Sequence, residues 1–139
     1  MSAPYTYTNF SNGLADLTVT GIKRKARSIP DQLNPADIPY QFVRLPDGRE
    51  GPLTADGEGG WPNRTVELVI VASPVGLSRQ PTNHALVLTL IDALTTTLRA
   101  VAATNTISQS KLSWEIRGEI DFIGDTEYWL IVAPITGNG

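Results

Sequence analysis

The segment RTVELVIVASP, residues 64–74, constrains the fold most, because it is apolar on both of its alternating sides. In an extended strand, Leu68 and Ile70 point to one side, and Val69 and Val71 point to the other. A strand with two apolar faces needs cover on both sides, which an edge position does not provide. The sequence therefore predicts a central strand here, covered on both faces.

A single long helix is predicted over residues 81–103, PTNHALVLTLIDALTTTLRAVAA. Thr82 or Asn83, next to Pro81, offers an N-cap. About 20 helical residues extend roughly 30 Å, enough to cross a small sheet. The threonine triplet 95–97 has poor helix propensity, so packing must hold this part of the helix. The residues that follow the helical period are Leu86, Leu90, Ile91, Leu94, Leu98 and Val101.

The cleanest alternation lies near the C-terminus, in LSWEIRGEIDFIGD, residues 112–125. Gly124-Asp125 predicts a hairpin turn, and EYWLIVAPI, residues 127–135, returns as the paired strand. The first strand of this hairpin should have one core face and one charged face. The expected core residues are Leu112, Trp114, Ile116, Ile120 and Phe122, and the expected charged-face residues are Ser113, Glu115, Arg117, Glu119 and Asp121.

The remaining segments complete an α+β fold in a single domain, residues 1–139: a mainly antiparallel sheet, one long helix packed on one face, and a C-terminal β-hairpin. A short helix is expected near Ser11 to Leu17, with Ser11 or Asn12 as its cap. The other expected elements are a strand over 17–26, a proline-rich loop over 29–39, a strand over 40–45, and a long Gly/Pro-rich loop over 46–63 that contains Trp61.

Composition excludes several classes of protein. The chain has no cysteine, which removes disulfides, thiolate zinc sites and thiol nucleophiles. The first ten residues lack the charged and apolar regions of a signal peptide. The longest uninterrupted apolar runs, such as LVIVA, fall far below the roughly 18 residues that a spanning helix needs. We therefore expect no membrane contact.

The net charge of -3 argues against a protein that mainly holds nucleic acid by its phosphates. The charges are nonetheless separated along the chain. The segment GIKRKARSIP, residues 21–30, holds four bases within five positions, whereas residues 115–127 hold five acids and one base. If residues 21–30 form a strand end, bases lie on both of its faces, which is typical of an exposed sheet edge. Its predicted partner is protein.

No group of residues in the sequence indicates catalysis. His84 is the only histidine, so with no cysteine it cannot form a standard zinc or copper site, and no serine elbow accompanies it. Glu115, Glu119 and Asp121 share one strand face, where acid/base work is an alternative to a solvated surface or a subunit contact. We expect no catalytic, metal or cofactor-binding residues, and hence no enzyme and no cofactor.

The order of elements resembles that of the tail terminator and neck proteins of long-tailed bacteriophages. The resemblance runs from about Leu14 to Pro134. It is carried by the strand ending in ADIPYQF, the strand VELVIVASPVG, the bridge and helix SRQPTNHALVLTLIDAL, and the final hairpin WEIRGEIDFIGDTEYWLIVAP. It rests on short phrases and element order, without a diagnostic motif.

This resemblance implies a virion protein assembled in the host cytoplasm. Members of that family form a hexameric ring at the head-proximal end of the tail, where the ring ends tube polymerisation and docks to the head connector. The implied partners are other copies of the chain, the tail tube protein and a head connector or neck protein, with passing contact to genomic DNA.

The predicted interface residues come from the charge separation and from Trp61 in the long loop, which either anchors the loop itself or contacts a partner. In a head-to-tail ring, the basic segment of one subunit would meet the acidic strand of the next. Three alternatives stay open: another neck or minor tail component of similar fold, a small-ligand-binding or enzymatic α+β domain, and a nucleic-acid-binding module. The predicted interface residues are Lys23, Arg24, Lys25, Arg27, Trp61, Glu115, Glu119 and Asp121.

Overall fold

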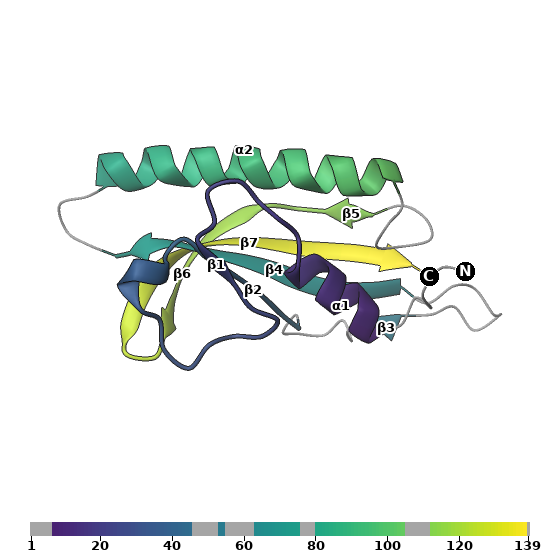
Figure 1. Ribbon diagram of the computed structural model, residues 1–139, viewed down its shortest axis with the longest axis horizontal. Helices are drawn as coiled ribbons and strands as arrows, with labels where there is room; N and C mark the ends of the chain where they lie inside the picture. Colours follow the sequence, from purple (N-terminus) through teal and green to yellow (C-terminus); the bar gives the residue numbers. More distant parts are fainter. Residues whose placement is uncertain (1–6, 46–52, 55–62, 76–79, 105–111, 139) are drawn as a thin grey trace.

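A computed structural model of the chain describes residues 7–45, 53–54, 63–75, 80–104 and 112–138 (Figure 1). It confirms the α+β fold, with one long helix on a mainly antiparallel sheet and a C-terminal hairpin. The helices are α1 (Tyr7–Ala15), a short 3-10 turn η1 (Pro35–Asp37) and α2 (Gln80–Thr104). The strands are β1 (Arg24–Lys25), β2 (Tyr40–Arg44), β3 (Leu53–Thr54), β4 (Asn63–Pro74), β5 (Ser113–Trp114), β6 (Arg117–Ile123) and β7 (Thr126–Asn138).

The sheet is built around β4, as its two apolar faces predict. The strand order is β1-β2-β4-β7-β5, with β3 beside β4 and β6 beside β7. β4 and β7 pair antiparallel from Asn63↔Asn138 to Pro74↔Tyr128, and β2 pairs antiparallel with the other side of β4. Leu68, Ile70 and Val71 are fully buried, which confirms cover on both faces of the central strand.

One face of the sheet is covered by α1 and α2 (Figure 1). Leu90, Leu94 and Leu98 lie one turn apart on α2 and are buried against this face. The helix begins at Gln80, so the predicted caps Thr82 and Asn83 lie inside its first turn. Each hydroxyl of the threonine triplet 95–97 donates to the carbonyl four residues earlier, which satisfies these side chains within the helix.

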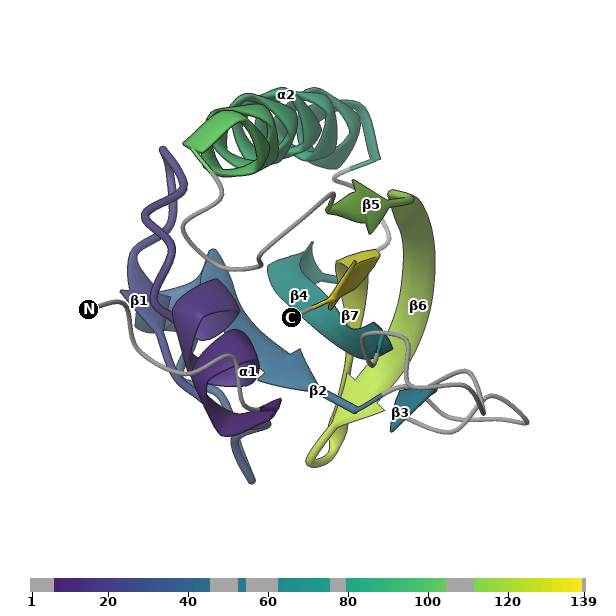
Figure 2. The same ribbon diagram turned by 90° about the vertical axis from the view of Figure 1, so that its right-hand side faces the viewer.

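The other face is enclosed by the curl of the sheet itself (Figure 2). Phe42, Val69 and Val132 are fully buried there, although neither α-helix of the described residues contributes to this core. The curl is strong enough for Arg44 of β2 to contact Glu119 of β6, across the two strands that separate them. At the other end, Ile38 and the partly buried side chains of Ala26 and Leu33 close the enclosed core.

Two N-terminal predictions require correction. The strand predicted over 17–26 is reduced to β1, because Gly21 adopts a positive φ of 97° in a turn that interrupts the extended chain. The helix predicted near Ser11 to Leu17 begins earlier, at Tyr7, and ends at Ala15. Its position follows from Phe10 and Leu14, which lie one turn apart and are both buried in the core beneath α2.

The prediction of a core face on the final hairpin is confirmed only in part. Registers from Trp114↔Ile135 to Phe122↔Glu127 place its apolar residues on the α2 side of the sheet, as the alternation predicts. Leu112 is buried, but Ile120 and Phe122 are 45% and 59% exposed. These two side chains lie on an edge strand where the described residues provide no cover.

The segment His84–Thr104 of α2 is, among the described residues, the one long enough and apolar enough to cross a membrane by length and composition. Its length is not evident from uninterrupted apolar runs, because threonines and two charged residues are dispersed among its leucines. In the structure, α2 packs its row of leucines on the sheet, as a helix that covers a core does.

The predicted Gly124-Asp125 turn is confirmed, because Ile123 pairs directly with Thr126. Gly124 has φ 63°, and a Cβ at this position would lie 3.1 Å from the carbonyl oxygen of Asp31. We expect Gly124→Ala to lower the free energy of unfolding by about 1–2 kcal/mol, because the left-handed conformation is costly for a residue with a Cβ.

The matched control is Gly118→Ala, because a Cβ there meets nothing within 4 Å. This variant should remain within about 0.5 kcal/mol of the parent protein in urea unfolding. Equal losses for both variants would contradict the role assigned to the turn.

Candidate functional site

At the basic edge of the sheet, two of the four bases are ion-paired within the chain. Arg27 makes two hydrogen bonds to the carboxylate of Asp16, at 2.7 and 3.2 Å. Arg24 contacts Asp37 at 3.3 Å. Both arginines are more than half exposed, so solvent screens these pairs and they stabilise the fold little. The hydrogen bond from Arg27 lowers the pKa of Asp16, and the charge of Arg27 adds to this effect.

Of the remaining two bases, Lys25 contacts the backbone and Lys23 is exposed. Lys25 donates to the backbone carbonyl of Asp16 at 2.7 Å, just after the end of α1. Lys23 is exposed and makes no ion pair with the described part of the chain. β1 is the terminal strand of the sheet, which confirms the predicted edge position of the basic segment. The predicted role of these bases in subunit contact stays a prediction.

A groove of about 310 Å³ lies beside this edge, and we call it the basic groove. Its wall is fixed by Gln41, a fully buried side chain of β2 that donates to the carbonyls of Ala15 and Leu17. The groove therefore combines apolar residues with a basic rim on one anchored segment. Its lining residues are Leu17, Thr18, Val19, Ile22, Lys23, Arg24 and Lys25.

Of the three predicted acidic interface residues, Glu119 is engaged within the chain. It lies 3.4 Å from Arg44 and 3.7 Å from Arg117. Glu115 and Asp121 are exposed and make no ion pair with the described residues, although Asp121 accepts a hydrogen bond from the backbone amide of Phe122. On this side of the hairpin, Glu119 therefore stabilises the fold, whereas Glu115 and Asp121 are exposed to a partner.

Glu67 is the main residue that the sequence analysis did not single out. It is buried, with a residue exposure of 6%, and accepts from Arg44 at 2.7 Å and from Arg117 at 3.1 Å. Together with Glu119, these residues form a four-member ion-pair network that joins β2, β4 and β6. The network lies on the enclosed face of the sheet, so its first role is to hold the curl.

The protonation of Arg44 follows from this network. Burial acts to lower the pKa of Arg44, but the hydrogen bond to Glu67 and the charges of Glu67 and Glu119 outweigh it. The pKa of Arg44 therefore lies above its ordinary value, and the guanidinium remains charged. Because each charge of the network has an opposite neighbour, this group is better suited to structure than to proton transfer.

An exposed apolar surface, which we call the β6 patch, lies at the other edge of the sheet. It consists of Val75, Ile120 and Phe122, with Glu127 between them and the partly buried Trp129 beside Ile120. Phe122 pairs across the strands with Glu127, whose carbonyl accepts from the backbone amide of Val75. Half of the six large apolar side chains that are exposed in the described ranges gather here.

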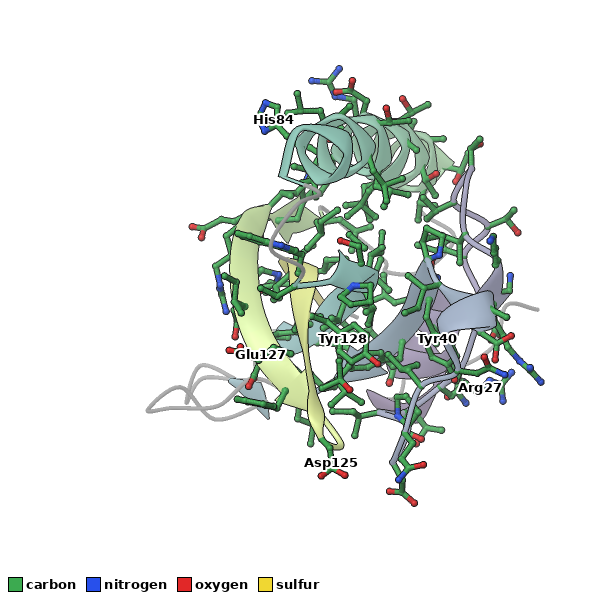
Figure 3. The ribbon with its side chains drawn as sticks, turned by 90° about the vertical axis from the view of Figure 1, so that its left-hand side faces the viewer. Arg27, Tyr40, His84, Asp125, Glu127 and Tyr128 are labelled. Carbon is green, nitrogen blue, oxygen red and sulfur yellow. The ribbon has the colours of Figure 1, made fainter. Side chains whose placement is uncertain are left out.

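The β6 patch and the basic edge lie on opposite sides of the molecule. Figure 3 shows Glu127 beside β6 and Asp125 at the hairpin tip, with Arg27 on the opposite side. The exposed acid Glu127 lies within the patch and Asp125 lies at the neighbouring hairpin turn, whereas the bases line the groove at the other edge. The sequence indicated the charge separation, but the alternation alone did not show that Ile120 and Phe122 are uncovered.

Two residues named from the sequence remain, His84 and Trp61. His84 lies exposed on the outer surface of α2 (Figure 3). Across the described ranges, no group of three or more His, Cys, Asp or Glu side chains is placed to hold a metal ion. Trp61 and most of the 46–63 loop lie outside the described residues, so the predicted anchor role of Trp61 stays a prediction.

No protein-family model matches the chain, and no curated protein matches its sequence. The function is therefore inferred from the fold, from these two surfaces and from the resemblance in element order.

Proposed function

We propose that this chain is a structural subunit of a ring at the head-proximal end of a long-tailed bacteriophage tail. In this role the ring ends polymerisation of the tail tube and docks to the head connector. The observation that carries the proposal is the pair of dissimilar surfaces at the two edges of one sheet, the β6 patch and the basic groove. A subunit with two different contact surfaces assembles head-to-tail, and such a chain of contacts closes into a ring when the rotation allows.

The fold supports the same proposal. The elements on which the resemblance rests are present in the expected order: β2, the central β4, α2 and the final hairpin of β6 and β7. The proposed partners are further copies of the chain, the tail tube protein and a connector or neck protein. The proposed location is the virion, after assembly in the host cytoplasm.

Internal ion pairing weakens the nucleic-acid alternative. Arg24 and Arg27 already face Asp37 and Asp16, so phosphate contact would compete with pairs that the chain makes itself. A net charge of -3 opposes non-specific binding to DNA as well. Contact with a genome that passes through the ring needs no affinity of that kind.

Negative-stain electron microscopy of the purified chain tests the ring directly. We expect annular particles with six-fold symmetry and a central hole, alone or at the ends of added tail tubes. In the virus, loss of the gene should give tails of uncontrolled length. Normal tails that lack heads would instead indicate a joining role, and a chain that neither forms rings nor binds tubes would contradict the proposal.

A further inference from the structure

We propose that the β6 patch of one copy docks into the basic groove of the next copy. This inference rests on the ring of the proposed function for its premise of self-association, and it adds which surfaces meet. The patch supplies an apolar projection with an acidic residue at its centre. The groove supplies an apolar lining with a basic rim.

The patch has the character of a surface that a partner covers. Phe122 is the most exposed large apolar residue in the described ranges, at 59%, and Ile120 is 45% exposed. The two lie together on the seven-residue edge strand β6. Edge strands in monomeric proteins are usually protected by charge, by proline or by a covering segment. Here the α2 side of β6 carries two adjacent apolar residues without cover, which favours burial against another surface.

The groove matches the patch in chemistry. Leu17 and Ile22, which are only partly buried, provide apolar contact for a side chain such as Phe122. Lys23, exposed and unpaired within the described chain, lies on the rim. Glu127, the acid at the centre of the patch, makes no ion pair in the described structure and would meet this lysine. Apolar contact would supply affinity, and charge complementarity would set the orientation.

The same charges disfavour a symmetric contact between two β6 patches. Asp125 and Glu127 are exposed near Phe122 in each copy, so a two-fold interface would bring acids against acids. A patch-to-groove contact places acids against bases. Figure 2 shows β6, which carries the patch, and β1, which borders the groove, at opposite edges of the sheet. Each copy therefore uses one surface for each neighbour.

The first test compares Phe122→Ser with Leu45→Ser in the full-length chain. The two side chains are matched in exposure, at 59% and 56%, but Leu45 lies at the far end of β2 from the hairpin turn. Light scattering after size exclusion should show about a tenfold or greater loss of self-association for Phe122→Ser and little change for Leu45→Ser. Thermal melting checks that both variants fold.

The second test exchanges charges across the proposed contact. Lys23→Glu and Glu127→Lys should each weaken self-association, and the double variant should restore it, because the exchanged charges again oppose each other. A double variant that is as weak as the sum of the single ones would overturn the pairing of these residues.

Cysteine cross-linking decides between the geometries, and the natural chain contributes no cysteine of its own. Lys23→Cys mixed with Glu127→Cys should give disulfide-linked dimers, and the double variant should give a ladder. Arg99→Cys, on the exposed side of α2, is the control.

The outcomes separate this inference from the proposed function. Rings that persist in Phe122→Ser and never cross-link through positions 23 and 127 would overturn the patch-to-groove contact and leave the ring intact. Cross-linking of Glu127→Cys alone would show a two-fold contact and overturn the inference as well. Efficient 23–127 cross-linking in a chain that never caps a tail tube would support the contact and contradict the tail function.

Discussion

Replacing Leu94 with alanine is expected to lower the free energy of unfolding by about 3–4 kcal/mol. Leu94 is fully buried in the middle of the row by which α2 contacts the sheet. Truncation removes apolar burial and leaves a cavity that the rigid β4–β7 pair cannot fill. The effect should be large because Leu94 lies between Leu90 and Leu98, the other fully buried side chains by which α2 packs on the face that it covers together with α1. Figure 1 shows how α2 runs along this face.

Leu88→Ala is the matched control, because Leu88 is on the same helix and is 49% exposed. Its unfolding free energy should differ from that of the parent protein by less than about 0.5 kcal/mol. Urea unfolding monitored by far-ultraviolet circular dichroism measures both variants, and tryptophan fluorescence tests whether sheet and helix unfold together. Equal losses would mean that α2 does not pack on the sheet through the Leu94 side.

The central elements could be predicted from sequence because their patterns report the environment directly. A strand with two apolar faces is stable where both faces are covered. β4 lies in such a position, between the two hydrophobic cores. The 3.6-residue period of α2 likewise identified the buried row of leucines. The Gly124-Asp125 turn followed from the steric freedom of glycine, which is a local property.

Burial at the sheet edge could not be predicted in the same way. Alternation places Ile120 and Phe122 on the α2 side of the sheet, but only the tertiary structure shows that no described segment covers them. The partners of the basic segment depend on contacts with Asp16 and Asp37 that no spacing indicates. The interface surfaces therefore come from the structure, and the charge separation was their only signal in the sequence.

Glu67 did carry a signal, namely a carboxylate within an otherwise apolar central strand. A buried charge of this kind needs a partner, because desolvation without one is costly. The partner is Arg44, which lies directly opposite in the β2–β4 register. The curl of the sheet, which no local pattern predicts, adds Arg117 and Glu119 and turns a pair into a network.

We expect Glu67→Ala to lower the free energy of unfolding by about 3 kcal/mol. The substitution leaves Arg44 with a side chain only 23% exposed and without its 2.7 Å partner, while Glu119 at 3.4 Å compensates in part. Arg117 is half exposed and can return to water. The loss should therefore come mainly from the uncompensated charge of Arg44.

A double variant separates that charge penalty from the net contribution of the pair. Replacing both partners, as in Arg44→Met with Glu67→Leu, removes the buried charges together, and Arg117 and Glu119 keep their own contact at 3.7 Å. This variant should be more stable than Glu67→Ala and close to the parent protein, because well-packed apolar residues replace buried ion pairs at little cost. If the double variant is instead the less stable one, the network contributes net stability to the curl beyond charge compensation, and our explanation of the Glu67→Ala loss is wrong.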